Sequence, residues 1–200
     1  MKASSSGTPT SRTNAAAAKA STSSAHRSLP HNHFELFELP AAYAIDLGTL
    51  EQSYRKLQSL VHPDRYASAG EAEKRASLQW TTRVNEAYGT LKDPVQRGKH
   101  LLELRGVDVA FETDTRMPPD FLMQQMELRE DLEAAIAKRD VAFLDTLNGK
   151  LLAQRDGLER EIAESIDEKK DYAEAAARVR KLMFLQRINA EIDAAYEAIE

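Results

Sequence analysis

Apolar residues recur at helical spacing along residues 46–61 and predict an amphipathic helix there. They follow one another at steps of four, three and four residues, so they share one face of the helix. Asp46 is suited to cap the start of this helix. Pro63 ends it, because proline disfavours the helical conformation at the preceding residue. The apolar face consists of Leu50, Tyr54, Leu57 and Val61.

A second amphipathic pattern predicts a long helix over residues 71–91, which ends before Asp93-Pro94. A short helix is expected in "HFELFELP", residues 33–40, and another short helix is expected to end at Gly106. These patterns together predict two long antiparallel helices flanked by two short ones. The apolar face of the second long helix consists of Trp80, Val84, Ala87, Tyr88 and Leu91.

The segment "TRMPPD", residues 115–120, separates this region from the rest of the chain. Two consecutive prolines cannot lie inside a helix, but Pro119 can begin one. Long Ala-, Leu- and Glu-rich segments then predict three helices with short links, which favours an antiparallel bundle. The expected fold class is therefore all-α. The three predicted helices span residues 119–140, 141–168 and 172–199.

The first predicted helix of the bundle has an apolar patch outside its core face. Leu122, Met123 and Met126 lie roughly 100–200° from that face and share their side with Glu127 and Glu130. A small apolar patch edged by acids is a candidate binding surface, and methionine adapts to the shape of a partner. The alternative is burial of this patch against the first domain. The expected core face consists of Phe121, Leu128, Leu132, Ala135 and Ile136.

Composition narrows the possible partners. The chain has 27 Lys+Arg and 32 Asp+Glu, a formal net charge of -5, so no basic bias indicates nucleic acid or membrane as a partner. It has no cysteine, which excludes disulfides, thiolate metal sites and cysteine nucleophiles and suits a reducing cytosol. Its apolar runs are shorter than the roughly 20 residues that span a bilayer.

Charge is distributed unevenly along the chain. Residues 1–33 are rich in Ser, Thr and Ala and contain no acid, which predicts a disordered tail or, alternatively, an organelle transit peptide. Residues 34–106 are neutral, whereas residues 107–200 have 22 acids and 13 Lys+Arg. We expect a tail over 1–33, a first domain over 34–106, a linker over 107–118 and a bundle over 119–200.

The sequence contains no motif that indicates catalysis. It lacks the phosphate-binding GxxxxGK[ST] and the dinucleotide-binding GxGxxG patterns. His31 and His33 have no third metal ligand near them in the sequence, and carboxylate pairs on amphipathic helices usually form a solvated face. We therefore expect no enzyme, no metal site and no cofactor.

The tripeptide His62-Pro63-Asp64 lies between the two long helices of the first domain. Alone, it is ordinary helix-ending sequence. Between two matched amphipathic helices, it is interpreted as a contact surface for another protein. Together with residues of "VNEAYGTLKDPVQR", it resembles the J-domain of DnaJ-type co-chaperones. The matching residues are His62, Pro63, Asp64, Asn85, Ala87, Tyr88, Leu91, Asp93, Pro94 and Arg97.

The resemblance implies that the His-Pro-Asp turn docks on an ATP-dependent heat-shock chaperone and stimulates its ATPase. It also implies that Arg55, Lys56 and Arg65 help to dock, as basic side chains orient a protein toward an acidic partner. Two residues depart from the family pattern. Arg65 replaces a frequent lysine, and His100 stands where a tyrosine is common.

Three segments together resemble HscB, the J-type co-chaperone of iron–sulfur cluster assembly, over residues 33–200. They are "FELFELPAAYAIDLGTLEQSYRKLQSLVHPDRYA", "FLMQQMELREDLE" and "VRKLMFLQRI". The resemblance implies that the bundle binds an IscU-type scaffold protein and that the J-domain presents it to an HscA-type chaperone. The absence of cysteine favours a bacterial, cytoplasmic type over a mitochondrial matrix protein.

On the pattern of this family, the scaffold site lies on the first helix of the bundle, with an aromatic anchor from the last. Our own assignment of helical faces places Phe184 at the edge of the core stripe formed by Leu185, Ile188 and Ile192, so core and contact roles both stay open for it. The implied scaffold-binding residues are Leu122, Met123, Met126, Glu127, Arg129, Glu130 and Phe184.

Two other interpretations of the sequence stay open. The first is a general J-domain co-chaperone whose bundle serves for dimerisation or client binding. The second is a plain helical interaction protein, in which His62-Pro63-Asp64 only ends a helix.

Overall fold

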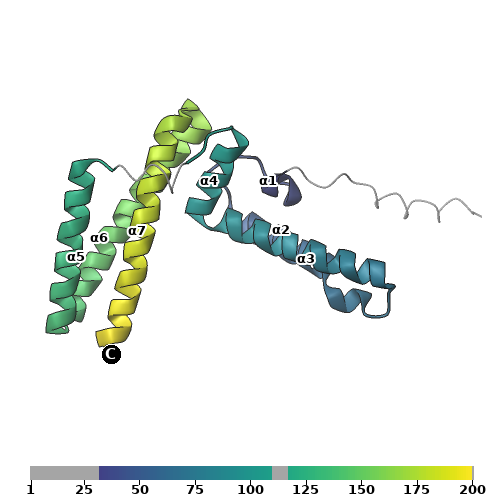
Figure 1. Ribbon diagram of the computed structural model, residues 1–200, viewed down its shortest axis with the longest axis horizontal. Helices are drawn as coiled ribbons and strands as arrows, with labels where there is room; N and C mark the ends of the chain where they lie inside the picture. The colour runs from purple at the N-terminus through teal and green to yellow at the C-terminus, as the bar shows by residue number, and fades with distance from the viewer. Residues whose placement is uncertain (1–31, 110–116, 200) are drawn as a thin grey trace, which may run out of the picture. The chain divides into compact units, whose positions relative to one another are not determined.

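The computed structural model describes residues 32–109 and 117–199, and every regular element in these ranges is a helix (Figure 1). The predicted all-α class is confirmed. The predicted tail lies outside the described residues except for Asn32 and His33, and most of the predicted linker lies outside them too. Among the described helices, none combines the length and apolarity needed to cross a bilayer.

The first domain follows the predicted order of short, long, long and short helices. Asn32 caps the first short helix through its side chain, so this helix begins at His33. Asp46 caps the first long helix, as predicted, and Asp93 caps the last short one. The elements are α1 His33–Leu36, α2 Leu47–Val61, η1 Pro63–Tyr66, α3 Glu71–Lys92 and α4 Pro94–Leu104.

Helices α2 and α3 pack together as the predicted antiparallel hairpin. Tyr54 and Tyr88 stack between them with ring centroids 4.0 Å apart. The hydroxyls of Ser77 and Thr81 donate to the carbonyl of Val61 at 2.6 and 3.1 Å, which satisfies a carbonyl left unpaired at the end of α2. The apolar faces predicted for the two helices therefore meet, and the turn between them is held from α3.

The second domain is the predicted three-helix bundle, in which α5 packs against both α6 and α7 (Figure 1). The middle helix does not keep one geometry over its predicted length. It is α-helical to Ala163 and then widens into a π-helix, η2. The elements are α5 Pro119–Lys138, α6 Val141–Ala163, η2 Glu164–Lys169 and α7 Tyr172–Ile199.

The core face of α5 differs from the prediction at two residues. Ile136 is 37% exposed, so its assignment to the core is wrong, whereas Gln125 is only 5% exposed. The buried residues of α5 follow steps of four, seven and three from Phe121 to Ala135, with the half-buried Leu128 between them. This stripe passes through Ala135 and leaves Ile136 about 60° from its centre.

Helix α4 packs against α7. The contact is close at Gly98, where an added Cβ would lie 2.8 Å from Cγ2 of Val179. Arg97 is buried beside it, donates to the carbonyl of Leu91 at 2.7 Å and covers the ring of Tyr43 at 4.8 Å. Glycine therefore lets the two backbones approach where a larger residue would separate them.

Candidate functional site

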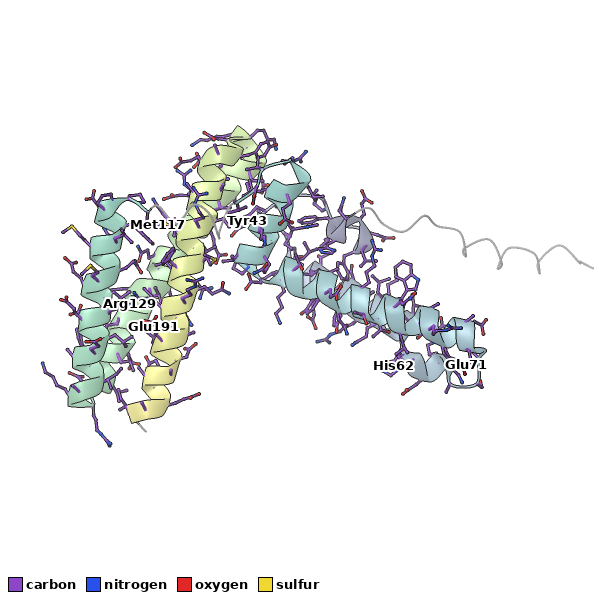
Figure 2. All side chains as sticks on the ribbon, in the orientation of Figure 1. Tyr43, His62, Glu71, Met117, Arg129 and Glu191 are labelled. Atoms are coloured by element: carbon purple, nitrogen blue, oxygen red, sulfur yellow. The ribbon has the colours of Figure 1, made fainter. Side chains whose placement is uncertain are left out.

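The His62-Pro63-Asp64 turn has more structure than the predicted loop. Pro63 begins the short 3-10 helix η1, and Nδ1 of His62 accepts a hydrogen bond from the amide of Asp64 at 3.3 Å. The side chain of Asp64 is 91% exposed and that of His62 is half exposed. Figure 2 shows His62 at the turn of the α2–α3 hairpin, remote from the α4 end. The turn therefore presents an accessible carboxylate on a structured backbone.

Arg65 and Tyr66 fold η1 back onto the end of α2. Nη1 of Arg65 donates to the carbonyl of Ser59 at 3.1 Å, and the hydroxyl of Tyr66 donates to the carbonyl of Leu60 at 3.3 Å. These bonds satisfy carbonyls that have no partner within the helix. Arg65 therefore has a structural role in the turn besides any role in docking.

The outer face of α2 exposes the two other predicted docking cations. The Arg55 side chain is 75% exposed, and its Nε donates to Glu51 at 2.8 Å. Lys56 is exposed on the same helix. Leu60, one turn after Lys56, is 48% exposed and was not predicted as a contact residue. Its position outside the apolar stripe of α2 is the sequence signal that would have indicated an exposed apolar side chain on this face.

The apolar patch predicted on α5 is exposed in the structure. Leu122, Met123 and Met126 are 43%, 60% and 62% exposed. The alternative, burial of these side chains against the first domain, is therefore wrong. An exposed cluster of one leucine and two methionines on a surface helix fits a protein-binding surface.

The charged residues predicted for the same surface lie on different sides of α5. Arg129 forms an ion pair with Glu191 of α7, with 3.1 Å between Nη2 and Oε1, and Figure 2 shows the two side chains between the helices. Glu127 lines a cavity of about 350 Å³ between α5 and α6. Glu130 is exposed. Arg129 therefore joins α5 to α7, and Glu127 borders the side of α5 that faces α6.

Phe184 is half-buried in the bundle. Its ring packs edge-on against Phe121 of α5, with centroids 6.3 Å apart, and the Arg187 guanidinium lies 5.7 Å from its centroid. Because Phe121 is itself buried, this contact joins α7 to the inner side of α5. Phe184 supports the helix that presents the patch, and only part of its ring is accessible to a partner.

The histidines considered as metal ligands are arranged differently from a metal site. His31 lies outside the described residues, and His33 stacks on His100 with ring centroids 4.3 Å apart. His100 also stacks on Phe34, with ring centroids 5.9 Å apart, so its imidazole takes part in the aromatic packing at this position. Within residues 32–109 and 117–199, no group of three or more His, Cys, Asp or Glu side chains could hold a metal ion.

Comparison with known proteins finds a matching family and similar chains. Residues 117–193 match the HSCB C-terminal oligomerisation domain family. The Co-chaperone protein HscB homolog of Burkholderia thailandensis is 51% identical over 173 residues, which cover 86% of this chain and 98% of that protein. The protein of the same name from Burkholderia vietnamiensis is 49% identical over the same shares of both chains.

Two solved structures are similar over most of their length. The Chaperone HscB from Vibrio cholerae has a TM-score of 0.76 and 34% identity, over 84% of this chain and 99% of that one. The human co-chaperone protein HscB has a TM-score of 0.78 and 28% identity, over 84% of this chain and 83% of that one.

Proposed function

The chain belongs to the HscB family of co-chaperones, and from that premise we propose that it acts in iron–sulfur cluster assembly. In this role it binds an IscU-type scaffold protein, delivers it to an HscA-type ATP-dependent chaperone and stimulates the ATPase of that chaperone. The observation that carries the proposal is that one chain exposes both a His62-Pro63-Asp64 turn and an apolar patch on α5.

The two functions belong to different parts of the chain. Residues 34–106, extended by Asn32 and His33, form the chaperone-docking J-domain, and residues 119–200 form the scaffold-binding bundle, with residues 107–118 as the linker. A protein that binds both partners at once raises the concentration of scaffold near the chaperone. The chain performs no covalent step in this scheme, and we place it in the cytoplasm, as its cysteine-free sequence suits a reducing compartment.

Docking on the chaperone uses the turn and the basic face beside it. Arg55 and Lys56 are exposed on α2 and attract an acidic surface, which raises the association rate and orients the encounter. The exposed carboxylate of Asp64 stands on η1 and offers an acceptor to a cation of the chaperone. Arg65 acts mainly by closing η1 onto α2.

Scaffold binding uses the exposed patch of Leu122, Met123 and Met126. Burial of apolar surface contributes about 25 cal/mol per Å², so burial of these three side chains against the scaffold favours binding. Glu127 and Glu130 border the patch and select against acidic partners. Arg129 and Phe184 hold α5 against α7 and keep the patch in place.

A binding assay with the purified scaffold protein tests the sharpest part of the proposal. Replacement of Leu122, Met123 and Met126 together by alanine is expected to weaken binding at least tenfold, measured by pull-down and calorimetry. Leu152→Ala is the matched control, because Leu152 is a comparably exposed leucine on α6. Scaffold binding that survives the triple substitution contradicts the proposed site.

The docking function is tested by the ATPase rate of an HscA-type chaperone. His62→Gln is expected to abolish stimulation while it leaves scaffold binding unchanged. Stimulation equal to that of the unaltered protein would support the interpretation in which the tripeptide only ends a helix.

One observation favours a second candidate function for the bundle. The family that matches residues 117–193 is described as an oligomerisation domain, so the bundle could join copies of the chain or bind general clients. Sedimentation equilibrium over a range of concentrations tests this. If the triple alanine variant no longer dimerises but still binds the scaffold, the patch serves for dimerisation. That result would favour a general J-domain co-chaperone.

A further inference from the structure

Glu51 lies at the junction between the docking face of α2 and helix α3. Its Oε1 accepts a hydrogen bond from Nε of Arg55 at 2.8 Å, one turn further along α2. Its Oε2 accepts a hydrogen bond from the hydroxyl of Tyr88 on α3. Both oxygens of this carboxylate therefore have a partner, one on each helix, and the carboxylate cannot rotate without loss of one of them.

The contact leaves the outer edge of the arginine accessible. A guanidinium is a planar group whose Nε–H points to one side, while its two terminal amino groups form a separate edge. Arg55 bonds to Glu51 through Nε, and its side chain is three-quarters exposed. The edge that can make a two-point contact with a partner carboxylate is therefore directed away from Glu51.

Tyr88 is itself held in place, so it is a firm anchor for Glu51. Its ring stacks on Tyr54, and the Lys92 ammonium lies 5.4 Å from its centroid. The hydroxyl of Tyr54 in turn lies 3.1 Å from Oδ1 of Asn85. The hydrogen bonds from Tyr88 and then Arg55 lower the pKa of Glu51, so this side chain is ionised at neutral pH.

We propose that Glu51 is a positioning residue for chaperone docking, which holds the Arg55 guanidinium in a binding-ready orientation and is itself anchored by Tyr88. This inference rests on the proposed docking role of Arg55. A flexible arginine loses side-chain freedom when it binds, and an arginine that is already held loses less, so positioning strengthens binding. An acid on this face also weakens the long-range attraction to an acidic partner, and the two effects have opposite signs.

The test measures ATPase stimulation of a purified HscA-type chaperone against the concentration of the full-length protein. Glu51→Gln removes the charge and keeps the shape. It is expected to raise the concentration for half-maximal stimulation about threefold, with an unchanged maximal rate. Arg55→Ala is expected to raise it further, and the double variant is expected to match Arg55→Ala alone, because Glu51 acts through Arg55.

Two further variants separate positioning from a general effect on the fold. Tyr88→Phe keeps the stacked ring but removes the anchor, and it is expected to change half-maximal stimulation in the same direction as Glu51→Gln. Glu103→Gln is the control, because Glu103 forms an ion pair with Lys99 one turn away on α4, outside the docking face. In Glu51→Gln, the raised pKa of Tyr88, which the hydrogen bond to Glu51 causes, is expected to fall. The chain has six tyrosines, so the difference between alkaline absorbance titrations with and without Tyr88→Phe isolates this change.

Three results would overturn the inference. They are tighter docking of Glu51→Gln, docking equal to that of the unaltered protein, and an effect that persists without Arg55. Tighter docking would mean that Glu51 competes with the chaperone for Arg55.

His62→Gln separates this inference from the proposed function. If His62→Gln abolishes stimulation while Glu51→Gln changes nothing, only the positioning role fails, whereas full stimulation by His62→Gln removes the docking role on which it rests.

Discussion

The carboxylate of Asp167 in η2 accepts hydrogen bonds from the backbone amide of Tyr43, 124 residues earlier in the chain, at 2.8 and 3.1 Å. It also accepts one from the amide of Ala44 at 2.9 Å. The segment between α1 and α2 is thereby fastened to the turn between α6 and α7. No helical pattern indicates this contact, because Asp167 lies in a predicted helix that carries many other acidic residues.

Removal of the Asp167 carboxylate is expected to destabilise the protein. Hydrogen bonds to a charged group contribute about 1.5–3 kcal/mol, so Asp167→Ala should lower the free energy of unfolding by about 2 kcal/mol. Asp167→Asn retains one acceptor oxygen and should lose about half as much. Urea unfolding followed by circular dichroism measures both, with Glu168→Ala as a control on a neighbouring exposed acid. Equal stability of Asp167→Ala and Glu168→Ala would contradict the role of these bonds.

Two glycines in helices should respond in opposite ways to alanine. Gly98→Ala brings a Cβ within 2.8 Å of Val179 and is expected to lower the free energy of unfolding. The loss should be about 1–2 kcal/mol, because overpacking outweighs the gain in helix propensity. Gly89→Ala on α3 meets no atom within 4 Å and should stabilise the protein by about 1 kcal/mol. Denaturant unfolding of both variants compares them, and a stabilised Gly98→Ala would show that α4 and α7 are not closely packed there.

Stability should fall in mild acid because of His100. Burial, and then the nearby His33, lower the pKa of His100 from 6.5 to about 4. Between these values the unfolded chain binds a proton that the folded protein does not, so the free energy of unfolding falls as the pH drops through this interval and is constant above it. Burial and the nearby Arg83 also lower the pKa of His33, so His33 contributes with the same sign.

His100→Phe isolates this contribution, because phenylalanine keeps the stacked ring and cannot titrate. The melting temperatures of the two proteins are expected to diverge below about pH 6.5 and to follow parallel courses above it. Parallel curves throughout acid conditions would mean that His100 is not buried in its neutral form.

The end of α5 can be stabilised by glycine. Arg139 has a φ of 51° and a ψ of 41°, the left-handed conformation that ends many helices and that glycine adopts without strain. Arg139→Gly is expected to raise the free energy of unfolding by about 1 kcal/mol. Arg139→Ala removes the same side chain but keeps the strain, so it should not stabilise. Thermal unfolding of the two variants distinguishes them, and an equal gain in both would point to the arginine charge instead.

The order of the helices and most of their ends follow from local sequence signals. Asp46 and Pro63 bound α2, and Pro119 begins α5, because capping and proline geometry act within a few residues. The exposure of Met123 and Met126 follows from helical periodicity for the same reason. These features need no knowledge of which helix packs against which.

Features that depend on distant residues were not predictable in this way. Gln125 is buried although it is polar, and its side-chain amide has no hydrogen-bond partner in the described structure. The pairing of Arg129 with Glu191 depends on how α5 lies against α7. From the sequence alone, Arg129 is predicted only to be an exposed charged residue. The half-burial of Phe184 likewise depends on Phe121 of another helix.

The bond from the Asp64 amide to Nδ1 has a consequence for the tautomer of His62. A neutral imidazole that accepts through Nδ1 must place its single ring proton on Nε2, so the other side of the ring is a donor. A group that meets this nitrogen must therefore be an acceptor, such as a carbonyl or a carboxylate.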